Sequence, residues 1–223
     1  MQKHLTNKLF YDKYLYKIVI INSLSHIFRN KNFRYAVKIL DKLQQDYESG
    51  RSLQMSNWRK VATVDENTFI DARNVYSWLK SLDDYMMRIE YNAMSLYSNN
   101  KPKLLELTSI VNPKRITSFH EPSEQYKGVL HPGVIIIDDD DFAYQYKVTL
   151  GNTTNCTGFA NWASVNSNQV KIGDVALNAL AQNQSGENYY FYARDEKTLQ
   201  LCNLMLNKIR RIDKIIKRTD LDK

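Results

Sequence analysis

Glycine, proline and cysteine are scarce in this sequence. Its 223 residues include only seven glycines, four prolines and two cysteines. Few glycines leave few positions for the tight loops whose backbone N–H groups surround a phosphate. The sequence also contains no GxGxxG, P-loop, HExxH or GxSxG motif. These absences argue against the common nucleotide-binding enzymes, zinc proteases and serine hydrolases, and we predict no cofactor and no metal site.

The cysteines and the apolar runs give no sign of a metal site, a signal peptide or a membrane span. Cys156 and Cys202 show neither CxxC spacing nor any other spacing typical of metal ligands. We therefore predict reduced, partly buried thiols in a cytosolic setting. Residues 1–21 contain no uninterrupted apolar segment of signal-peptide length and no small-residue cleavage site, so no signal peptide is predicted. Because no run approaches the ~18 apolar residues of a membrane span, the sequence predicts a cytoplasmic protein without membrane contact.

Tyrosine and positive charge are abundant instead. The chain has 15 tyrosines, a net charge of +7 and a pI near 9.2. A field of this sign favours an acidic partner, most simply a nucleic acid. Tyrosine suits strands and interfaces, because its ring can be half buried while its hydroxyl stays in water. The richness in Lys, Asn, Ile and Tyr is typical of AT-rich genomes, and from that bias we hypothesise a viral or phage protein in a host cytoplasm.

Two parts of the chain have closely similar patterns. In each, an aromatic extended run is followed by a polar helix start, an apolar stripe at helical spacing and a basic pair. A tyrosine-rich strand pattern precedes both parts at a distance. The matched pieces are Tyr14–Ile20 with Tyr144–Leu150, Leu96-Tyr97 with Phe191-Tyr192, the stripe Leu104, Leu107 and Ile110 with Leu199, Cys202 and Met205, and Arg115-Ile116 with Arg211-Ile212. Because the pieces occur in the same order, they predict a tandem duplication.

The duplication predicts an α+β fold of two pseudo-repeated ferredoxin-like units. Extended and helical patterns in the second copy follow the order βαββαβ. The first copy keeps this order and carries an inserted helix, because Ala72, Val75 and Leu79 share one helical face. The predicted boundaries are 8–120 for the first repeat with its inserted helix at 68–86, 121–137 for a connector, 138–218 for the second repeat and 219–223 for a tail.

Individual elements follow from the same periodicities. In the first copy we predict a helix at 33–48 and a strand at 88–97. Within the connector, the apolar run Val134–Ile137 is expected to pair as an edge strand or to pack between the domains. In the second copy the predicted elements are a strand at 142–150, a helix at 156–165, a strand and a connection within 169–180, a strand at 189–193, a helix at 195–207 and a strand at 209–216.

The outer face of the second sheet is the first candidate site. In its first strand Gln145, Lys147 and Thr149 alternate with apolar residues, which predicts one solvent-exposed face, whereas both faces of the first sheet are predicted to be buried. Lys147, Tyr190 and Tyr192 would then form a surface on which bases stack, as on RNA-recognition domains. The neighbouring residues do not match the RNA-recognition signature. The alternative is that the tyrosines belong to an ordinary half-buried strand.

A basic strand near the C-terminus is the second candidate. Its six basic residues are accompanied by a single acidic one, Asp213. Such a density of positive charge favours phosphate binding. A solvated edge strand, kept from aggregating by its charges, is the alternative. The six basic residues are Lys208, Arg210, Arg211, Lys214, Lys217 and Arg218.

Two further patterns bear on catalysis. The acidic run Asp138–Asp141 has the residue type that binds Mg²⁺ when carboxylates converge, but a solvated turn that balances the basic strand is the alternative. The histidines occur in no metal-spaced pair and have no Ser or Cys partner at a recognised spacing. They are His4, His26, His120 and His131. None of these residues is assigned a catalytic role.

Tandem ferredoxin-like domains resemble the RNA-processing endonucleases of CRISPR systems in plan. Those enzymes carry a Gly-rich loop near the C-terminus, whereas the last glycine here is Gly186, so no residue is assigned from the resemblance. Our leading prediction is a non-enzymatic protein that binds RNA or DNA through phosphate contacts with weak sequence preference. The alternatives are a structural or assembly protein that binds other protein chains, and a Mg²⁺-dependent nuclease acting through Asp138–Asp141.

Overall fold

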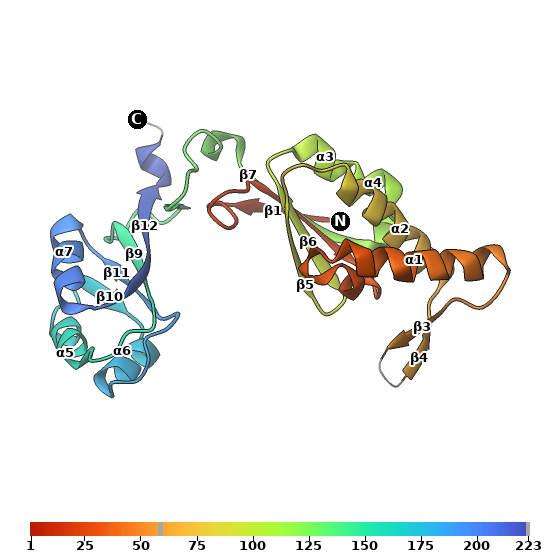
Figure 1. Ribbon diagram of the computed structural model, residues 1–223. Coiled ribbons are helices and arrows are strands. Elements are labelled where there is room, and N and C mark those ends of the chain that lie inside the picture. The colour runs from red at the N-terminus through yellow and green to blue at the C-terminus, as the bar shows by residue number, and fades with distance from the viewer. Residues whose placement is uncertain (58–59, 222–223) are drawn as a thin grey trace. The chain divides into compact units, whose positions relative to one another are not determined.

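The computed structural model describes residues 1–57 and 60–221. Within this part of the chain, seven α-helices and two five-stranded sheets form a mixed α+β structure (Figure 1). None of the described helices is long and apolar enough to cross a membrane. The chain divides into two compact units with one five-stranded sheet each. The first unit comprises Met1–Thr6 and Lys13–Lys127, and the second comprises Asn7–Asp12 and Gly128–Lys223.

The sheet of the first unit has the strand order β1–β7–β2–β6–β5. Neighbouring strands are antiparallel, except that β1 runs parallel to β7. The central strand β2 directs Tyr16, Ile18 and Ile20 into the core, which explains its aliphatic alternation. The strands are β1 (Gln2–Thr6), β2 (Tyr16–Ile21), β5 (Met86–Glu90), β6 (Ala93–Ser98) and β7 (Ile116–Pro122).

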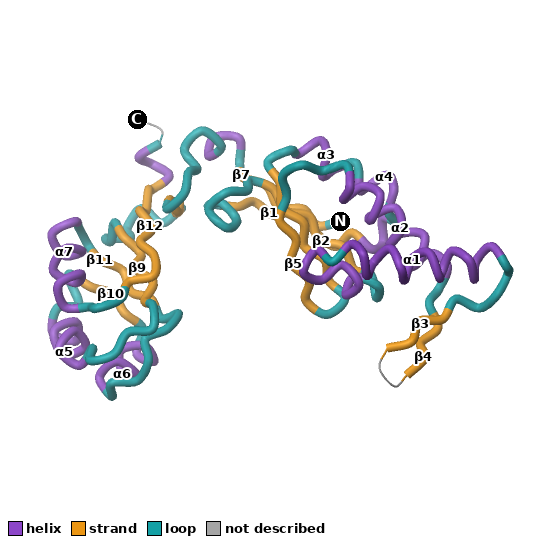
Figure 2. Tube along the Cα trace, viewed as in Figure 1, coloured by secondary structure: helices purple, strands orange, loops and turns teal. Residues whose placement is uncertain are grey.

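Helices cover the core-facing side of this sheet (Figure 2). α1 has the predicted bounds, because Asn32 caps its start and Ala36, Leu40 and Leu43 form its buried stripe. A separate hairpin of β3 and β4 follows α1 and was not predicted. The elements are α1 (Phe33–Glu48), β3 (Gln54–Asn57), β4 (Lys60–Thr63), α2 (Glu66–Lys80), α3 (Lys101–Leu105) and α4 (Leu107–Ile110).

Two predicted elements of the first unit need correction. The helix predicted at 68–86 ends at Lys80, because the hydroxyl of Ser81 donates to the carbonyl of Trp78 and closes the last turn. The apolar period continues beyond that point only because the following loop and β5 also face the core. The strand predicted at 88–97 is the hairpin of β5 and β6, which turns at Tyr91 with a φ of 53°.

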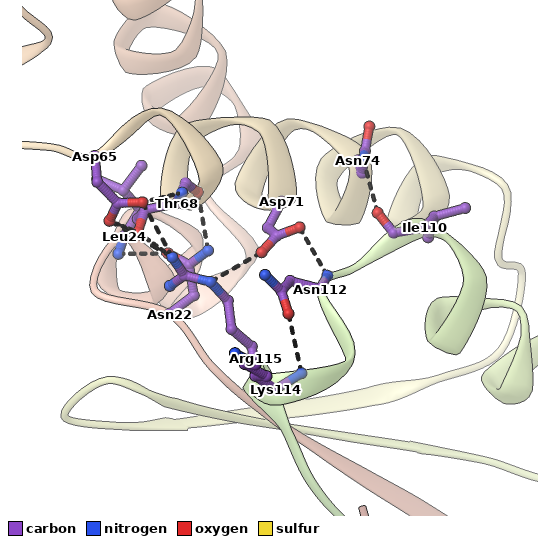
Figure 3. A network of polar contacts seen from close by, with 10 residues as sticks. All are labelled: Asn22, Leu24, Asp65, Thr68, Asp71, Asn74, Ile110, Asn112, Lys114 and Arg115. Atoms are coloured by element: carbon purple, nitrogen blue, oxygen red, sulfur yellow. Dashed lines mark hydrogen bonds and ion pairs between the residues drawn. The ribbon is translucent and has the colours of Figure 1, made fainter.

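Polar contacts join the start of α2 to the loop that leads into β7 (Figure 3). Arg115 Nε lies 2.9 Å from Oδ2 of the buried Asp71, and the other oxygen of that carboxylate accepts a hydrogen bond from the N–H of Asn112. The same guanidinium donates to the hydroxyl of Thr68 and lies 3.2 Å from Asp65, the capping residue of α2. A buried carboxylate with these partners fixes the helix to the strand.

The sheet of the second unit has the strand order β10–β11–β9–β12–β8. Its neighbouring strands are antiparallel except for β12 and β8, which run parallel. The predicted strands agree with the observed ones to within a few residues. They are β8 (Val134–Ile137), β9 (Tyr146–Leu150), β10 (Val170–Ile172), β11 (Tyr190–Ala193) and β12 (Ile209–Lys217).

Three helices pack on one side of the second sheet. Val148 and Phe191 point into this core, where they meet Phe159 of α5 and Cys202 of α7. α7 begins after Asp195, which accepts a hydrogen bond from the N–H of Thr198. The predicted connection within 169–180 contains a helix, α6. The helices are α5 (Thr157–Val165), α6 (Asp174–Ala181) and α7 (Glu196–Met205).

The order of the second sheet settles the place of two predicted strands. The apolar run Val134–Ile137 is the edge strand β8, which confirms one of the two alternatives predicted for it. The basic strand β12 lies between β9 and β8, so the interpretation of it as an edge strand is wrong. A parallel pairing between strands more than 70 positions apart in the sequence gives no local signal, which is why the sequence did not indicate it.

Candidate functional site

One face of the second sheet points away from α5, α6 and α7. Because Val148 and Phe191 point into the core, their neighbours along β9 and β11 point to the opposite side. The strand register brings these neighbours into two rows across the sheet. One row is Lys171, Tyr192, Lys147 and Asp213, and the other is Tyr190, Thr149 and Arg211. We call these seven residues the outer face.

Lys147 occupies the middle of the outer face. Its ammonium nitrogen lies 4.1 Å from the centroid of the Tyr190 ring, which is a cation–π contact. Burial lowers the pKa of Lys147, the charges of Lys8 and Arg211 lower it further, and Asp213 opposes them. A partly desolvated ammonium group interacts more strongly with an anion than one in open water does.

Four aromatic rings gather beside Lys147. The Tyr192 ring packs edge-to-face against Phe142 at 5.0 Å and Tyr190 at 5.7 Å between centroids, and Tyr144 lies 6.5 Å away. Burial raises the pKa of the Tyr192 hydroxyl, and the charge of Tyr190 adds to the effect. Tyr190 keeps 47% of its surface exposed. The structure thus brings together the predicted residues Lys147, Tyr190 and Tyr192.

The sequence did not identify Phe142 and Tyr144 as members of this cluster. Strict alternation would place even-numbered residues on the side opposite Lys147. An irregularity before β9 breaks that alternation, because Gln145 donates its N–H to the carbonyl of Ala193 although Tyr146 already pairs with the same residue. The only sequence signal for them was the closeness of two aromatic residues to the strand.

Arg211 is held by two carboxylates at the β12 side of the outer face. Its guanidinium lies 2.6 Å from Asp12 and 2.5 Å from the buried Asp213. Asp12 belongs to Asn7–Asp12, a segment of the second unit that also accepts a hydrogen bond from the N–H of Ile136 through the carbonyl of Asn7. The positive charge of Arg211 is therefore largely compensated within the unit.

The other predicted basic residues do not gather on one face. Lys214 pairs with Tyr146 and so lies on the side opposite Arg211, and Lys208 precedes the strand; both are exposed. Arg210, at a register irregularity of β12, donates to the side chain of Asn188. Lys217 and Arg218 lie near the acidic run Asp138–Asp141. Lys217 donates to the carbonyl of Asp140, and Arg218 lies 4.0 Å from Asp138.

The acidic run lies in the turn between β8 and β9. Asp139 accepts a hydrogen bond from the N–H of Asp141, and Asp140 accepts one from the hydroxyl of Thr219. Among residues 1–57 and 60–221, no three His, Cys, Asp or Glu side chains are placed to hold a metal ion. The run thus contacts Lys217, Arg218 and Thr219 at the end of the basic strand.

Two of the histidines meet on the first sheet. His4 of β1 and His120 of β7 lie opposite each other, with their rings stacked at 4.6 Å between centroids. The Nε2 of His120 lies 3.0 Å from the hydroxyl oxygen of Ser118, two residues earlier on the same strand. Burial, with smaller contributions from the charges of Lys17 and His4, lowers the pKa of His120 to about 4. This imidazole is neutral at pH 7.

The comparisons with known proteins identify no relative. No protein-family model, no curated protein sequence and no solved structure matches the chain.

Proposed function

We propose that the protein binds nucleic acid, RNA or DNA, on the outer face of its second sheet, without catalysing a reaction. The contact that carries this proposal is the Lys147 ammonium group 4.1 Å above the Tyr190 ring. It places a cation for a phosphate next to a half-exposed aromatic surface for a base. The net charge of +7 would attract the polyanion to the protein before these contacts form.

The outer face supplies two cations for phosphates. Lys147 and Lys171 flank Tyr192 in the register, one on each neighbouring strand. Arg211 contributes less, because Asp12 and Asp213 compensate its charge. Contacts of this kind neutralise phosphates and release counterions without reading base edges, so binding depends on salt and has weak sequence preference.

We also propose that both units are copies of one ferredoxin-like plan. Four strands of each sheet are arranged in the same way. Their order is β7–β2–β6–β5 in the first sheet and β12–β9–β11–β10 in the second, and all neighbouring strands in both sets are antiparallel. In both sets the order across the sheet, counted along the chain, is fourth, first, third and second strand. This is the order of the split βαβ motif. The register agrees with the sequence alignment of two pieces, since Lys17 lies opposite Tyr97 as Lys147 lies opposite Tyr192.

The last aligned piece, Arg115-Ile116 with Arg211-Ile212, needs a different correspondence. Ile116 lies opposite Ile20 in the first sheet, and Ile209 lies opposite Leu150 in the second. Ile116 therefore corresponds to Ile209, and the alignment of Arg115-Ile116 with Arg211-Ile212 is displaced. Both pieces contain an arginine followed by an isoleucine, which made the displaced match look equally good.

A pair of matched charge reversals tests the binding proposal. Lys147→Glu with Lys171→Glu changes the outer face, and Lys208→Glu with Lys214→Glu changes the exposed part of the basic strand by the same total charge. Binding of a fluorescently labelled oligonucleotide is measured by anisotropy over a series of salt concentrations. We expect the first pair to weaken binding much more than the second. Equal losses would mean that only net charge matters, and a larger loss from the second pair would move the site to the basic strand.

Purification separates this proposal from the remaining alternatives. A protein that binds nucleic acid keeps it at low salt and loses it at high salt, which the ultraviolet absorbance ratio reports. An assembly protein would instead elute clean as a defined oligomer, and exposed apolar residues on the helices of the second unit favour this second candidate. These residues are Val165, Val175 and Leu204. A nuclease would degrade nucleic acid with Mg²⁺, and Asp139→Ala with Asp141→Ala would abolish the activity.

A further inference from the structure

Lysine and aromatic side chains alternate on the outer face in a repeated arrangement. Lys147 lies over the Tyr190 ring at 4.1 Å, and Lys171 lies over the Phe142 ring at 5.4 Å. Between these two pairs stands Tyr192, which is edge-to-face with both rings, at interplanar angles of 78° and 85°. The outer face and the adjoining Phe142 thus present two rings, each with an ammonium group above it, on either side of a third ring.

From this arrangement we infer that the nucleic acid bound by the protein is single-stranded, with an unpaired base stacked on Tyr190 and a neighbouring base on Phe142, each on the side of the ring away from its lysine. The inference rests on the proposed function and specifies its ligand. In a duplex each base already stacks on its neighbours, so it has no free face to offer to an aromatic side chain. An unpaired base has a free face, and stacking on aromatic residues is the usual way in which proteins hold single strands.

The shape of the outer face agrees with a single strand. Reading a duplex requires a helix or a two-stranded ribbon that enters a groove, whereas these side chains stand on the face of a sheet between other strands. Neighbouring strands of a sheet are roughly 4.8 Å apart, so Lys147 and Lys171, one strand to each side of Tyr192, stand roughly 10 Å apart at their Cα atoms. This separation suits contacts to different phosphates of one extended strand. The rings between them then face the bases.

The decisive variant removes the ring and keeps the charge. Tyr190→Leu preserves apolar bulk on the strand, and the adjacent core residue Phe191 is untouched. Tyr35→Leu is the matched control, because Tyr35 is similarly exposed, 44% against 47%, and lies on α1 of the first unit. Phe142→Leu tests the second ring at a position that precedes β9 and so leaves the strand pairing intact. Circular dichroism shows whether each variant is folded.

The measurement is the anisotropy of a labelled oligonucleotide of mixed sequence, offered as single-stranded RNA, single-stranded DNA and the DNA duplex at one salt concentration. We expect single strands to bind more tightly than the duplex. Tyr190→Leu should weaken single-strand binding by about tenfold or more, with an unchanged salt slope because the phosphate contacts remain. Phe142→Leu should act in the same direction, and Tyr35→Leu should have no effect.

The other outcomes distinguish the two proposals. Equal or tighter binding of the duplex, together with wild-type affinity of Tyr190→Leu, overturns the inference and leaves nucleic-acid binding in place. No binding of any of the three oligonucleotides overturns the proposed function itself. A preference between the two single strands would assign RNA or DNA as the ligand.

Discussion

The Arg211 guanidinium and the Asp12 carboxylate form a two-point ion pair, although the residues are 199 positions apart in the chain. Nη1 donates to Oδ2 at 2.6 Å, and Nη2 lies 2.6 Å from Oδ1. Parallel contacts of this kind are the strongest geometry available to an arginine and a carboxylate. The pair attaches the segment Asn7–Asp12 to the second unit and compensates a charge on the outer face.

Asp12→Asn should strengthen nucleic-acid binding. The substitution removes one of the two anions beside Arg211, so the guanidinium becomes partly available to a phosphate. We expect an affinity gain of about threefold, the size of a partly exposed ion pair, and a steeper dependence on salt because another counterion is released. Titrations of wild type and variant at several salt concentrations measure both. Asp46→Asn, which removes a partner of Arg51 in the first unit, is the control. An unchanged slope in Asp12→Asn would show that Arg211 takes no part.

Stability should fall in mild acid because of His120. Its pKa is about 4 in the folded protein and near 6.5 when unfolded, so between these values the unfolded chain binds a proton that the folded chain does not. The stabilisation is complete above pH 6.5 and is lost as the pH falls toward 4. Because the ring is partly exposed, we expect a loss of only about 1 kcal/mol.

Urea unfolding at pH 7 and pH 5 measures this loss. In His120→Gln the difference between the two pH values should shrink, because the variant lacks the imidazole that binds a proton in the unfolded chain but not in the folded one. His131→Gln, at an exposed position, should leave the difference as in wild type. The same pH difference in His120→Gln as in wild type would assign the acid sensitivity to other groups.

Asp71→Ala should destabilise the first unit by about 3 kcal/mol, because it leaves Arg115 without its buried partner and the N–H of Asn112 without an acceptor. Asp84→Ala is the comparison. Asp84 is exposed, although it pairs with Lys13 and accepts a hydrogen bond from the hydroxyl of Tyr14, and its loss should destabilise the unit less than the loss of Asp71 does. Denaturant midpoints give both values. If the two variants were equally stable, the polar contacts around Arg115 would not hold α2 to β7.

The cysteines should be unreactive in the folded protein. Both thiols are buried, and burial raises the pKa of Cys202 to about 12. The thiolate is the reactive form, so a thiol reagent at pH 8 should modify Cys202 about a thousandfold more slowly in native protein than in denaturant. Mass spectrometry over a time course measures the rate at each site. Rapid labelling of Cys202 in native protein would mean that α7 opens readily.

The local elements of the fold could be predicted from sequence because their signals are local. α1 has its predicted bounds, since Asn32 and an apolar stripe at helical spacing mark it. α7 is marked in the same way by Asp195. The helix α6 was missed because its eight residues are too few to show a clear period. The end of α2 was missed because apolar residues in a loop that faces a core imitate a helical period. Side-chain spacing alone does not distinguish the two.

The site was only partly predictable, because its geometry depends on distant pairings. Lys147, Tyr190 and Tyr192 were found because strand alternation assigns them to one side. Asp12 was not found, since it meets Arg211 only through the fold. Phe142 was missed because the irregularity at Gln145 changes which side the preceding residues occupy. The basic strand was predicted at an edge because its pairing with β8 joins segments that are far apart in the sequence.

The central claim is that nucleic acid lies on the outer face of the second sheet, and photo-cross-linking tests it most directly. A single-stranded oligonucleotide with a photoreactive pyrimidine is cross-linked to the wild-type protein, and the modified peptides are identified by mass spectrometry. We predict cross-links at Tyr190, Tyr192 or Phe142 that disappear with excess unlabelled single strand. Cross-links confined to the first unit or to the exposed lysines of β12 would contradict the claim.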